Sequence, residues 1–144
     1  MQVQQILKSK GAAGVFTVTP DTLVSDAAKV LAEKRIGTVV VSEDGKSADG
    51  ILSERDIVRE LATRGGACLQ DSVATYMTRE LVTCGMASMA DEVLAKMTEG
   101  RFRHMPVVED GVLVGLVTLG DVVKARLSQV AMEKDALEGM IMGR

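Results

Sequence analysis

The sequence predicts an α+β fold built from two copies of one strand–helix–strand–strand–helix unit. Three observations lead to this prediction. The 144-residue chain repeats itself at a spacing of 66 residues, each copy has a Glu-Asp-Gly turn between two apolar runs, and the run after that turn passes into helical spacing. One copy of about 60 residues buries too little apolar surface to be readily stable alone. We therefore expect the copies to pack sheet to sheet about a pseudo-twofold axis.

The composition is that of a folded domain and limits the classes of partner. Apolar residues make up 47% and charged residues 26% of the chain. With two Phe, one Tyr, no Trp and a net charge of −3, no nucleic-acid partner is expected. Cys68, Cys84 and the single histidine, His104, are too few for a Cys/His metal site, so no metal is required. The N-terminus lacks a signal-peptide pattern and no apolar run approaches about 18 residues, which predicts a cytoplasmic protein without membrane contact.

The first copy, together with a short N-terminal segment, is expected to span residues 1–70. An opening helix is predicted from apolar residues at helical spacing and the glycines that end it, namely Val3, Ile6, Leu7, Gly11 and Gly14. A strand at 15–18 and a turn at 19–21 should lead into a helix that ends near Arg35. Thr22 or Ser25 can cap that helix. Its apolar face contains Ala27, Ala28, Leu31 and Ala32.

The remainder of the first copy reads as a hairpin followed by a helix. A buried strand is predicted at 36–41, and the turn at Glu43–Gly45 connects it to a second strand at 50–52. That strand meets the segment Ser53–Asp56, after which a helix should run to 64–66. Four apolar residues are expected to face inward from this helix: Ile57, Val58, Leu61 and Ala62.

The second copy, residues 71–144, repeats this order. Before the turn a shift of 66 residues aligns the copies, matching Thr17 with Thr83, Leu31 with Met97, Ile36 with Phe102 and Val41 with Val107. After the turn the second copy is one residue shorter, and a shift of 65 matches Gly50 with Gly115, Ser53 with Thr118 and Asp56 with Asp121. A loop tolerates such a deletion. The repeat therefore defines the structural unit, and Thr83 and Cys84 should lie on a strand equivalent to 15–18.

The C-terminal segment, Val122–Arg144, continues as a helix beyond the repeat. Its apolar residues form an incomplete stripe made of Val123, Leu127, Val130, Leu137 and Ile141. One interpretation is a self-association surface, which predicts a homodimer. The other is a tail that packs on its own domain.

A hydroxyl and a carboxylate stand at each strand-to-helix junction, in Ser53 with Asp56 and in Thr118 with Asp121. Such a pair can cap a helix, because the hydroxyl bonds a free N–H and the acid favours the helix dipole. The same groups can bind a ligand, with helix N–H groups receiving a phosphate and the carboxylate accepting from two sugar hydroxyls. The two roles can coexist.

These motifs resemble a tandem cystathionine-β-synthase (CBS) domain pair, or Bateman module, of the stand-alone bacterial type. Each copy contains the pattern Gly-apolar-apolar-Ser/Thr-x-x-Asp, as Gly50-Ile51-Leu52-Ser53-Glu54-Arg55-Asp56 and Gly115-Leu116-Val117-Thr118-Leu119-Gly120-Asp121. The segment His104–Gly111 and the two early strands add to the likeness, which covers almost all of residues 15–124.

The resemblance implies adenine-nucleotide clefts between the two copies. In such families the Ser or Thr meets phosphate and the Asp holds ribose hydroxyls, which nominates Ser53 with Asp56 and Thr118 with Asp121. Backbone and side chains near the first strands would line the base and sugar region, and these are Thr17, Gly37, Thr38, Val39, Thr83, His104, Met105 and Pro106. Arg55, Arg103 and His104 are either solvated charges or groups that neutralise a polyphosphate. Because Arg103 and His104 belong to the second copy alone, the tighter phosphate site is expected there.

The resemblance further implies a regulatory sensor and not an enzyme. AMP is the first expectation for its ligand, with ATP, ADP, NAD(H) or a related adenosyl compound as alternatives. Occupancy would be passed to an unknown protein partner in trans. Two other interpretations stay open, namely a dimeric interaction scaffold with vestigial clefts and a nucleotide-processing enzyme. The latter is disfavoured because one His with no Gly-x-Ser-x-Gly setting cannot build the usual nucleophile and base.

Overall fold

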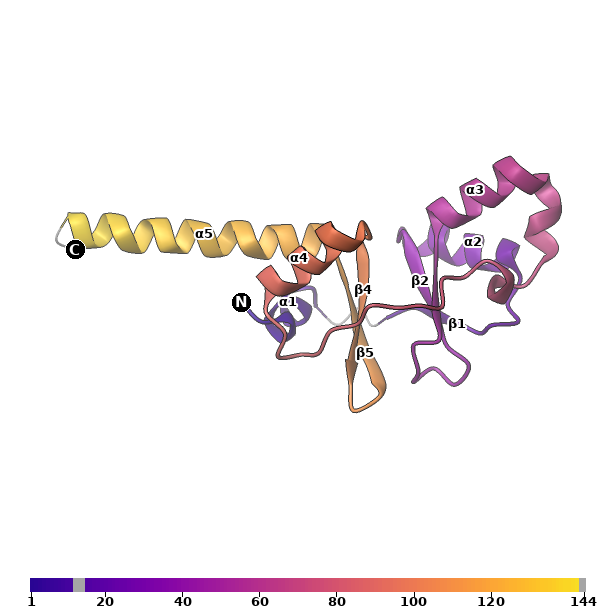
Figure 1. The fold of residues 1–144 in the computed structure, drawn as a ribbon, viewed down its shortest axis with the longest axis horizontal. Coiled ribbons are helices and arrows are strands. Elements are labelled where there is room, and N and C mark those ends of the chain that lie inside the picture. Colours follow the sequence, from indigo (N-terminus) through magenta and orange to yellow (C-terminus); the bar gives the residue numbers. More distant parts are fainter. Residues whose placement is uncertain (12–14, 143–144) are drawn as a thin grey trace. The chain divides into compact units, whose positions relative to one another are not determined.

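The computed structural model describes residues 1–11 and 15–142 and has the predicted α+β fold with its repeated unit (Figure 1). The first copy contains β1 (Thr17–Val18), α2 (Val24–Lys34), β2 (Thr38–Val41), β3 (Gly50–Ser53) and α3 (Glu54–Arg64), preceded by α1 (Val3–Ser9). Two short 3₁₀ helices, η1 (Gly65–Gln70) and η2 (Val73–Thr75), follow. The second copy contains α4 (Ala90–Gly100), β4 (His104–Glu109), β5 (Val112–Thr118) and α5 (Leu119–Ile141).

The chain forms two compact units, each assembled from segments that are distant in sequence. The three-strand unit contains β1, β2, β3, α2 and α3, and the long-helix unit contains α1, α4 and α5. The β4–β5 hairpin contributes its tip, residues 106–115, to the three-strand unit and its base to the long-helix unit. The N-terminal helix thus belongs with the helices of the second copy.

The three-strand unit is built on the sheet β1-β2-β3. β1 pairs parallel with β2, and β2 pairs antiparallel with β3 in a register that sets Thr38 opposite Ser53. All four residues of β2 are buried, as expected for a central strand. Its core gathers aliphatic residues from the sheet, α2, α3 and the segment after η1, namely Val24, Ala27, Leu31, Val39, Val41, Leu52, Ile57, Val73 and Met77.

Two expectations about the helices of this unit were wrong. Neither Thr22 nor Ser25 caps α2; the N-cap is Leu23, and the carbonyl of Asp71 instead accepts from Val24 N at 2.9 Å. Of the four apolar residues expected to face inward from α3, only Ile57 is buried, and Val58 is 63% exposed. The reason is that α3 contacts η1, α2 and β3 along one narrow face, so the neighbouring positions of the helix remain open to solvent.

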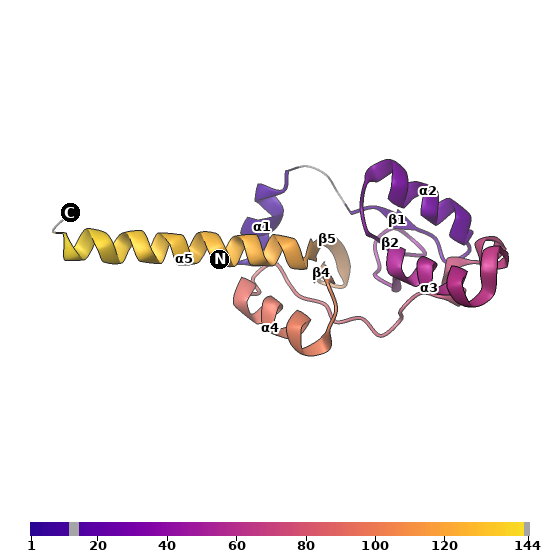
Figure 2. The ribbon, with the colours of Figure 1, turned by 90° about the horizontal axis from the view of Figure 1, so that it is seen from above.

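The long-helix unit is held together by its N-terminal segment. Val3 N donates to Ser88 O at 2.8 Å, and Ala90 N donates to Met1 O at 2.9 Å, so the chain start is tied to the entry of α4. α5 packs against α4 and α1 (Figure 2). α1 ends at Ser9, just before the expected Gly11, whereas Gly14 lies outside the described residues.

The two copies agree in local geometry up to their hairpins. α2 and α4 each end on an arginine in the left-handed region, with φ of 53° at Arg35 and 56° at Arg101. The next amide closes the same bond in both, Ile36 N to Leu31 O and Phe102 N to Met97 O, each at 3.1 Å. The strand expected around Thr83 is not formed, and Cys84 lies at an isolated bridge. Because β1 has just two residues, the loss of a single pairing reduces its counterpart to a bridge.

Gly50, the first residue of the motif, is required by close packing of the chain around residues 77–78. Ile51 exchanges two backbone hydrogen bonds with Thr78, at 3.0 and 2.9 Å. A Cβ on Gly50 would lie 2.5 Å from Met77 Sδ and 3.1 Å from the carbonyl oxygen of Thr78. A side chain at this position would require the Met77 side chain to move and would press against the Thr78 carbonyl.

We expect Gly50→Ala to lower the free energy of unfolding by about 1–3 kcal/mol, the usual cost of overpacking a filled site. Urea unfolding followed by circular dichroism measures the change. Gly66→Ala is the matched control, because an added Cβ there has nothing within 4 Å. Equal stability of the two variants would contradict the close approach at Gly50.

Candidate functional site

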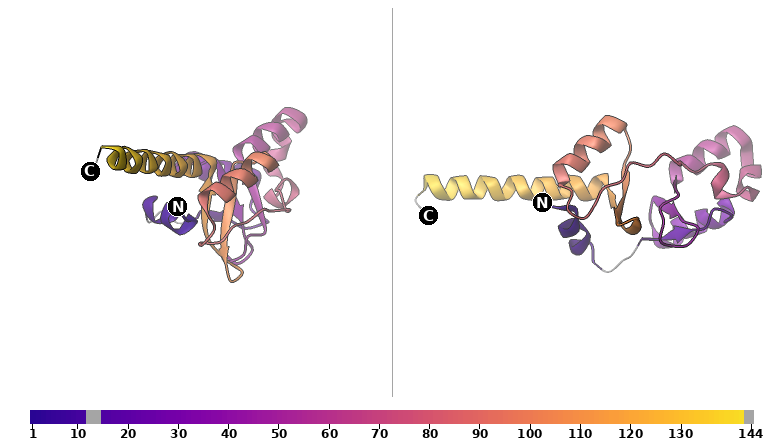
Figure 3. Two further views of the ribbon diagram at one scale, coloured as in Figure 1. Left: turned by 60° about the vertical axis from the view of Figure 1, so that its left-hand side comes forward. Right: turned by 60° about the horizontal axis from the view of Figure 1, so that its bottom comes forward.

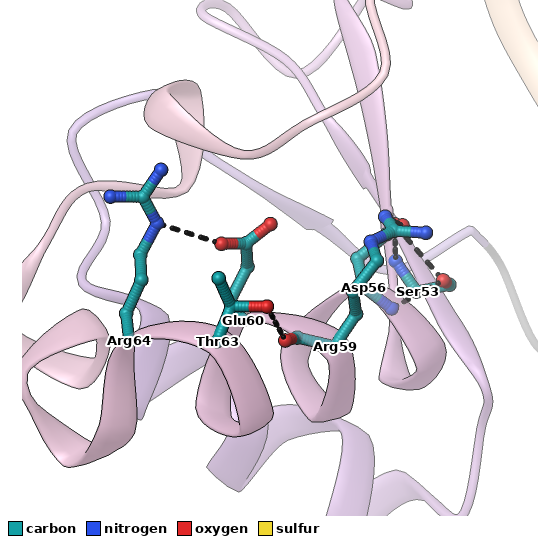
Figure 4. Close-up of polar contacts among 6 residues, drawn as sticks. All are labelled: Ser53, Asp56, Arg59, Glu60, Thr63 and Arg64. Atoms are coloured by element: carbon teal, nitrogen blue, oxygen red, sulfur yellow. Dashed lines mark hydrogen bonds and ion pairs between the residues drawn. The ribbon is translucent and has the colours of Figure 1, made fainter.

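The two strand-to-helix junctions form the same reciprocal capping box. In the first copy Ser53 N donates to Asp56 Oδ2 at 2.9 Å, and Asp56 N donates to Ser53 Oγ at 3.2 Å (Figure 4). In the second copy Thr118 N donates to Asp121 Oδ2 at 2.9 Å, and Asp121 N donates to Thr118 Oγ1 at 3.1 Å. The capping interpretation is therefore confirmed at both junctions. Ligand binding by the same groups stays a prediction.

A backbone hydrogen bond ties each junction to the start of the preceding strand. Glu54 N donates to Gly37 O at 2.9 Å, and Leu119 N donates to Arg103 O at 2.8 Å. These bonds relate equivalent residues, at shifts of 65 and 66 residues, so the one-residue deletion in the second hairpin leaves the junction unchanged. They bring Gly37 to the first junction and Arg103 to the second. That these residues and their neighbours Thr38 and His104 contact a ligand stays a prediction.

The acid of the first junction is paired within its own helix. Arg59 Nη2 lies 2.6 Å from Asp56 Oδ1, one turn along α3, and Ser53 Oγ donates to Asp56 Oδ2 at 3.0 Å (Figure 4). Both oxygens of Asp56 thus accept hydrogen bonds. Arg55, the basic residue that the sequence singled out, is exposed on the helix.

The acid of the second junction is paired with a lysine from the other end of the chain. Lys10 Nζ lies 2.8 Å from Asp121 Oδ2 and donates to the carbonyl of Leu116 at 3.1 Å. Burial raises the pKa of Asp121, but the hydrogen bonds and charge of Lys10 and the donors of Thr118 outweigh it, so the pKa lies below its ordinary value of 3.8. Oδ1 of Asp121 accepts no hydrogen bond from the part of the chain that the structure describes. Sequence reasoning missed Lys10, because no local pattern relates residues 111 positions apart.

Thr38 carries an unsatisfied hydroxyl at the first junction. Thr38 is 3% exposed. Among the buried side-chain oxygen and nitrogen atoms of the described residues, Thr38 Oγ1 is the one that has no hydrogen-bond partner. Thr38 pairs with Ser53 across the strands β2 and β3. A buried hydroxyl without a partner is costly, and such atoms in native proteins call for an explanation.

The other predicted site residues are divided between the two units. The three-strand unit contains Thr17 and Thr83, which are exposed, and Val39 and Pro106, which are buried. The long-helix unit contains buried Met105 with Arg103, half-buried His104, Thr118 and Asp121. Each unit therefore carries one complete junction. That these junctions line clefts between the copies stays a prediction.

Comparison with known proteins assigns the family. The family model of the CBS domain matches residues 12–63 and 73–128. The chain belongs to the CBS-domain family. It contains two CBS domains in tandem, and Ser53–Asp56 and Thr118–Asp121 are equivalent junctions of the first and second domain.

Several relatives share almost the whole chain. The crystal structure of the CBS-domain containing protein ATU1752 from Agrobacterium tumefaciens is 44% identical and has a TM-score of 0.82, covering 88% of this chain and 99% of that one. The mitochondrial CBS domain-containing protein CBSX3 of Arabidopsis thaliana is 32% identical over 98% of this chain and 72% of its own length. The CBS domain pair of protein MJ0100, in complex with 5′-methylthioadenosine and S-adenosyl-L-methionine, is 25% identical with a TM-score of 0.78, covering 90% of this chain and 98% of that one.

Two further properties bear on the chemistry of the CBS pair. Across the described ranges 1–11 and 15–142, no three His, Cys, Asp or Glu side chains gather closely enough to ligate a metal ion. None of the helices in those ranges has the length and apolar character needed to cross a bilayer.

We expect Thr38→Val to raise the free energy of unfolding by about 1 kcal/mol, because it removes a buried hydroxyl that has no partner. Chemical denaturation measures the change. Thr17→Val, at an exposed threonine of β1, should have little effect and serves as the control. A clear loss of stability in Thr38→Val alone would contradict the unsatisfied state of the hydroxyl.

Lys10→Met should raise the pKa of Asp121, because the half-buried carboxylate loses its cation. A carboxylate whose pKa is depressed by folding adds stability above its unfolded pKa, and this is lost as pH falls through the folded pKa. The variant should therefore be less stable than the parent at neutral pH, and the difference should shrink below about pH 4. NMR titration of the Asp121 carboxyl and unfolding at several pH values measure both effects.

Lys8→Met is the matched control for this prediction, since Lys8 is an exposed lysine of α1, two residues before Lys10. It should leave the pKa of Asp121 unchanged. An Asp121 pKa that is equal in the parent and in Lys10→Met would rule out the ion pair in solution.

Proposed function

We propose that this CBS pair is a non-catalytic regulatory module that binds an adenosyl ligand and passes its occupancy to a protein partner in trans. The observation that carries the proposal is the duplicated junction. Both copies present a hydroxyl, a carboxylate and a helix start in the same hydrogen-bonded geometry, tied to the preceding strand by an equivalent bond. The common tether brings the start of the preceding strand beside the helix start in both copies, so each junction presents groups from two elements.

The groups at the second junction suit a phosphorylated nucleoside. The N-terminus of α5 carries the positive end of the helix dipole, which favours a phosphate there. Oδ1 of Asp121 is available to accept from a ribose hydroxyl, while Lys10 and Arg103 supply positive charge within the same unit. At the first junction Arg59 already occupies the equivalent oxygen of Asp56. We therefore place the tighter nucleotide site at the second junction.

The ligand class follows from a relative and from these charges. The CBS domain pair of MJ0100 is described in complex with two adenosyl compounds. An adenosyl group is thus the common element, and the cations at the second junction favour a ligand that also carries phosphate. AMP is our first candidate, with ADP, ATP and NAD(H) as alternatives.

The same proposal includes a setting and an assembly. We place the protein in the cytoplasm as a homodimer, in keeping with the burial of both cysteines. The second candidate is an interaction scaffold, because the Ser/Thr and Asp of each junction already satisfy one another without a ligand. Ligand binding separates the two.

A thermal-shift panel of AMP, ADP, ATP, NAD, NADH, S-adenosylmethionine and 5′-methylthioadenosine tests the proposed function. A ligand at 100 times its dissociation constant should stabilise the fold by about 2.7 kcal/mol. Product analysis after long incubation with ATP tests for turnover, and none is expected. A flat response to every adenosyl compound would favour the scaffold.

The double variant Thr118→Ala with Asp121→Ala should weaken AMP binding several-fold or more, measured by calorimetry. Loss of a capping residue costs about 1 kcal/mol, so the fold should survive. Ser53→Ala with Asp56→Ala is the matched control, because it removes the same cap from the first CBS domain. We expect a smaller effect there, and unchanged affinity in both double variants would contradict the site.

A further inference from the structure

Most of α5 extends beyond the body of its unit. Val122 and Ala125 are buried, and the helix contacts α4 and α1 near its start. From residue 130 to 142 nearly every side chain is exposed, and the C-terminal part of the helix extends past α1 and α4 of its own unit in both views of Figure 3. The tail therefore does not pack on its own domain, which excludes one of the two interpretations of the sequence.

An apolar stripe runs along this exposed helix. Its members recur at intervals of four, three, seven and four residues, which are the a and d positions of a heptad repeat: Val123, Leu127, Val130, Leu137 and Ile141. Their exposed fractions range from 38% at Val123 to 84% at Ile141. At 3.6 residues per turn the stripe is centred about 130° around the helix from the buried residues Val122 and Ala125. It is a second face of α5, separate from the one that packs on α4.

Charges beside the stripe differ between its two ends. One edge carries Lys124 near the start, Ala131 in the middle and Glu138 near the end of the helix. The other edge carries Arg126 early and Glu133 late. The stripe is thus flanked by positive charge in its first half and by negative charge in its second.

We propose that this stripe binds the same stripe of a second copy of the chain, with the two α5 helices antiparallel. Centred on residue 132, this arrangement packs Leu127 on Leu137 of the partner copy and Val123 on Ile141 of the partner copy. Lys124 of each copy then lies beside Glu138 of the other, and the two Ala131 side chains meet near the twofold axis. The overlap spans residues 123–141, or about 28 Å of helix at 1.5 Å per residue.

Charge selects this orientation over a parallel one. In a parallel pair the e and g edges would place Glu133 of one helix beside Glu138 of the other, twice, which is repulsive. The antiparallel pair has two attractive contacts between Lys124 and Glu138 and one repulsive contact between the two Glu133 side chains. Lys134, which occupies the remaining core position, can extend to the edge, where it already lies 3.8 Å from its own Glu138. Apolar burial supplies the affinity and the charges set the direction.

This inference rests on the homodimer of the proposed function and gives it a surface and an orientation. It does not depend on nucleotide binding, because the stripe shares no residue with the junctions. The two can therefore fail separately.

Sedimentation equilibrium of charge-reversal variants at low salt tests the orientation. Glu138→Lys and Lys124→Glu should each weaken self-association several-fold, and the double variant should restore it, since it re-forms both contacts with the signs exchanged. A parallel pair predicts the opposite for Glu138→Lys, which would relieve repulsion and strengthen association. That outcome, or no change in any variant, would overturn the inference.

Disulfide formation gives an independent readout. Ala131→Cys should yield a covalent dimer on mild oxidation, whereas Val123→Cys should not, because its two copies would lie about 27 Å apart. The native thiols give little background, since Cys68 and Cys84 are buried and burial raises the pKa of Cys84 to about 11. Crosslinking through Val123→Cys but not Ala131→Cys would overturn the inference in favour of a parallel pair.

Two further outcomes separate this inference from the proposed function. A parent chain that is monomeric up to the highest concentrations measured would overturn both the α5 pairing and the homodimer. A dimer that is insensitive to every α5 variant would overturn the pairing alone. AMP binding, measured on the same variants, should remain at the parent level throughout.

Discussion

The reciprocal hydrogen bonding between a Ser or Thr and the Asp three residues later is the interaction on which the repeat depends. It satisfies donors at the start of a helix that would otherwise be unpaired, and it fixes where a strand ends and a helix begins. The bond from the next residue to the preceding strand, Glu54 N to Gly37 O or Leu119 N to Arg103 O, then aligns the first strand of the hairpin with that helix start. A few residues thus determine the relative placement of a hairpin and a helix in each CBS domain.

The same geometry accommodates two different charge environments. Asp56 is paired with Arg59 from its own helix, whereas Asp121 is paired with Lys10, which lies 111 residues away in the sequence. Lys124 is the residue of the second domain equivalent to Arg59. Asp121 nevertheless pairs with Lys10 and not with Lys124. Duplication preserved the backbone of the junction, and the side chains that meet it have diverged.

The sequence predicted the parts of the structure that local pattern and repetition determine. Helix and strand order, the turns and both junctions follow from periodicity, from Asp-Gly signals and from the alignment of Ser53 with Thr118.

The sequence did not predict the features that tertiary packing determines. Val58 is exposed because α3 is covered on one narrow side. Leu23, and not Thr22, is the N-cap of α2, and the Asp71 carbonyl accepts the hydrogen bond from Val24 N. Lys10 could not be found, since a contact across the whole chain has no signature in any window. The sequence showed Gly50 as part of a motif, but only the structure shows how closely Gly50 approaches Met77.

The membership of α1 in the unit of the second CBS domain has a consequence for folding during synthesis. α1 leaves the ribosome before the parts of the chain that hold it: Val3 bonds to Ser88, 85 residues later, and the neighbouring Lys10 pairs with Asp121, 111 residues later. Most of the three-strand unit is contained in residues 14–83 and is complete much earlier, apart from the hairpin tip. α1 therefore stays exposed until α4 and the start of α5 appear, and closing so long a loop costs more chain entropy than forming the local contacts of the three-strand unit. The long-helix unit is thus expected to become native after most of the three-strand unit.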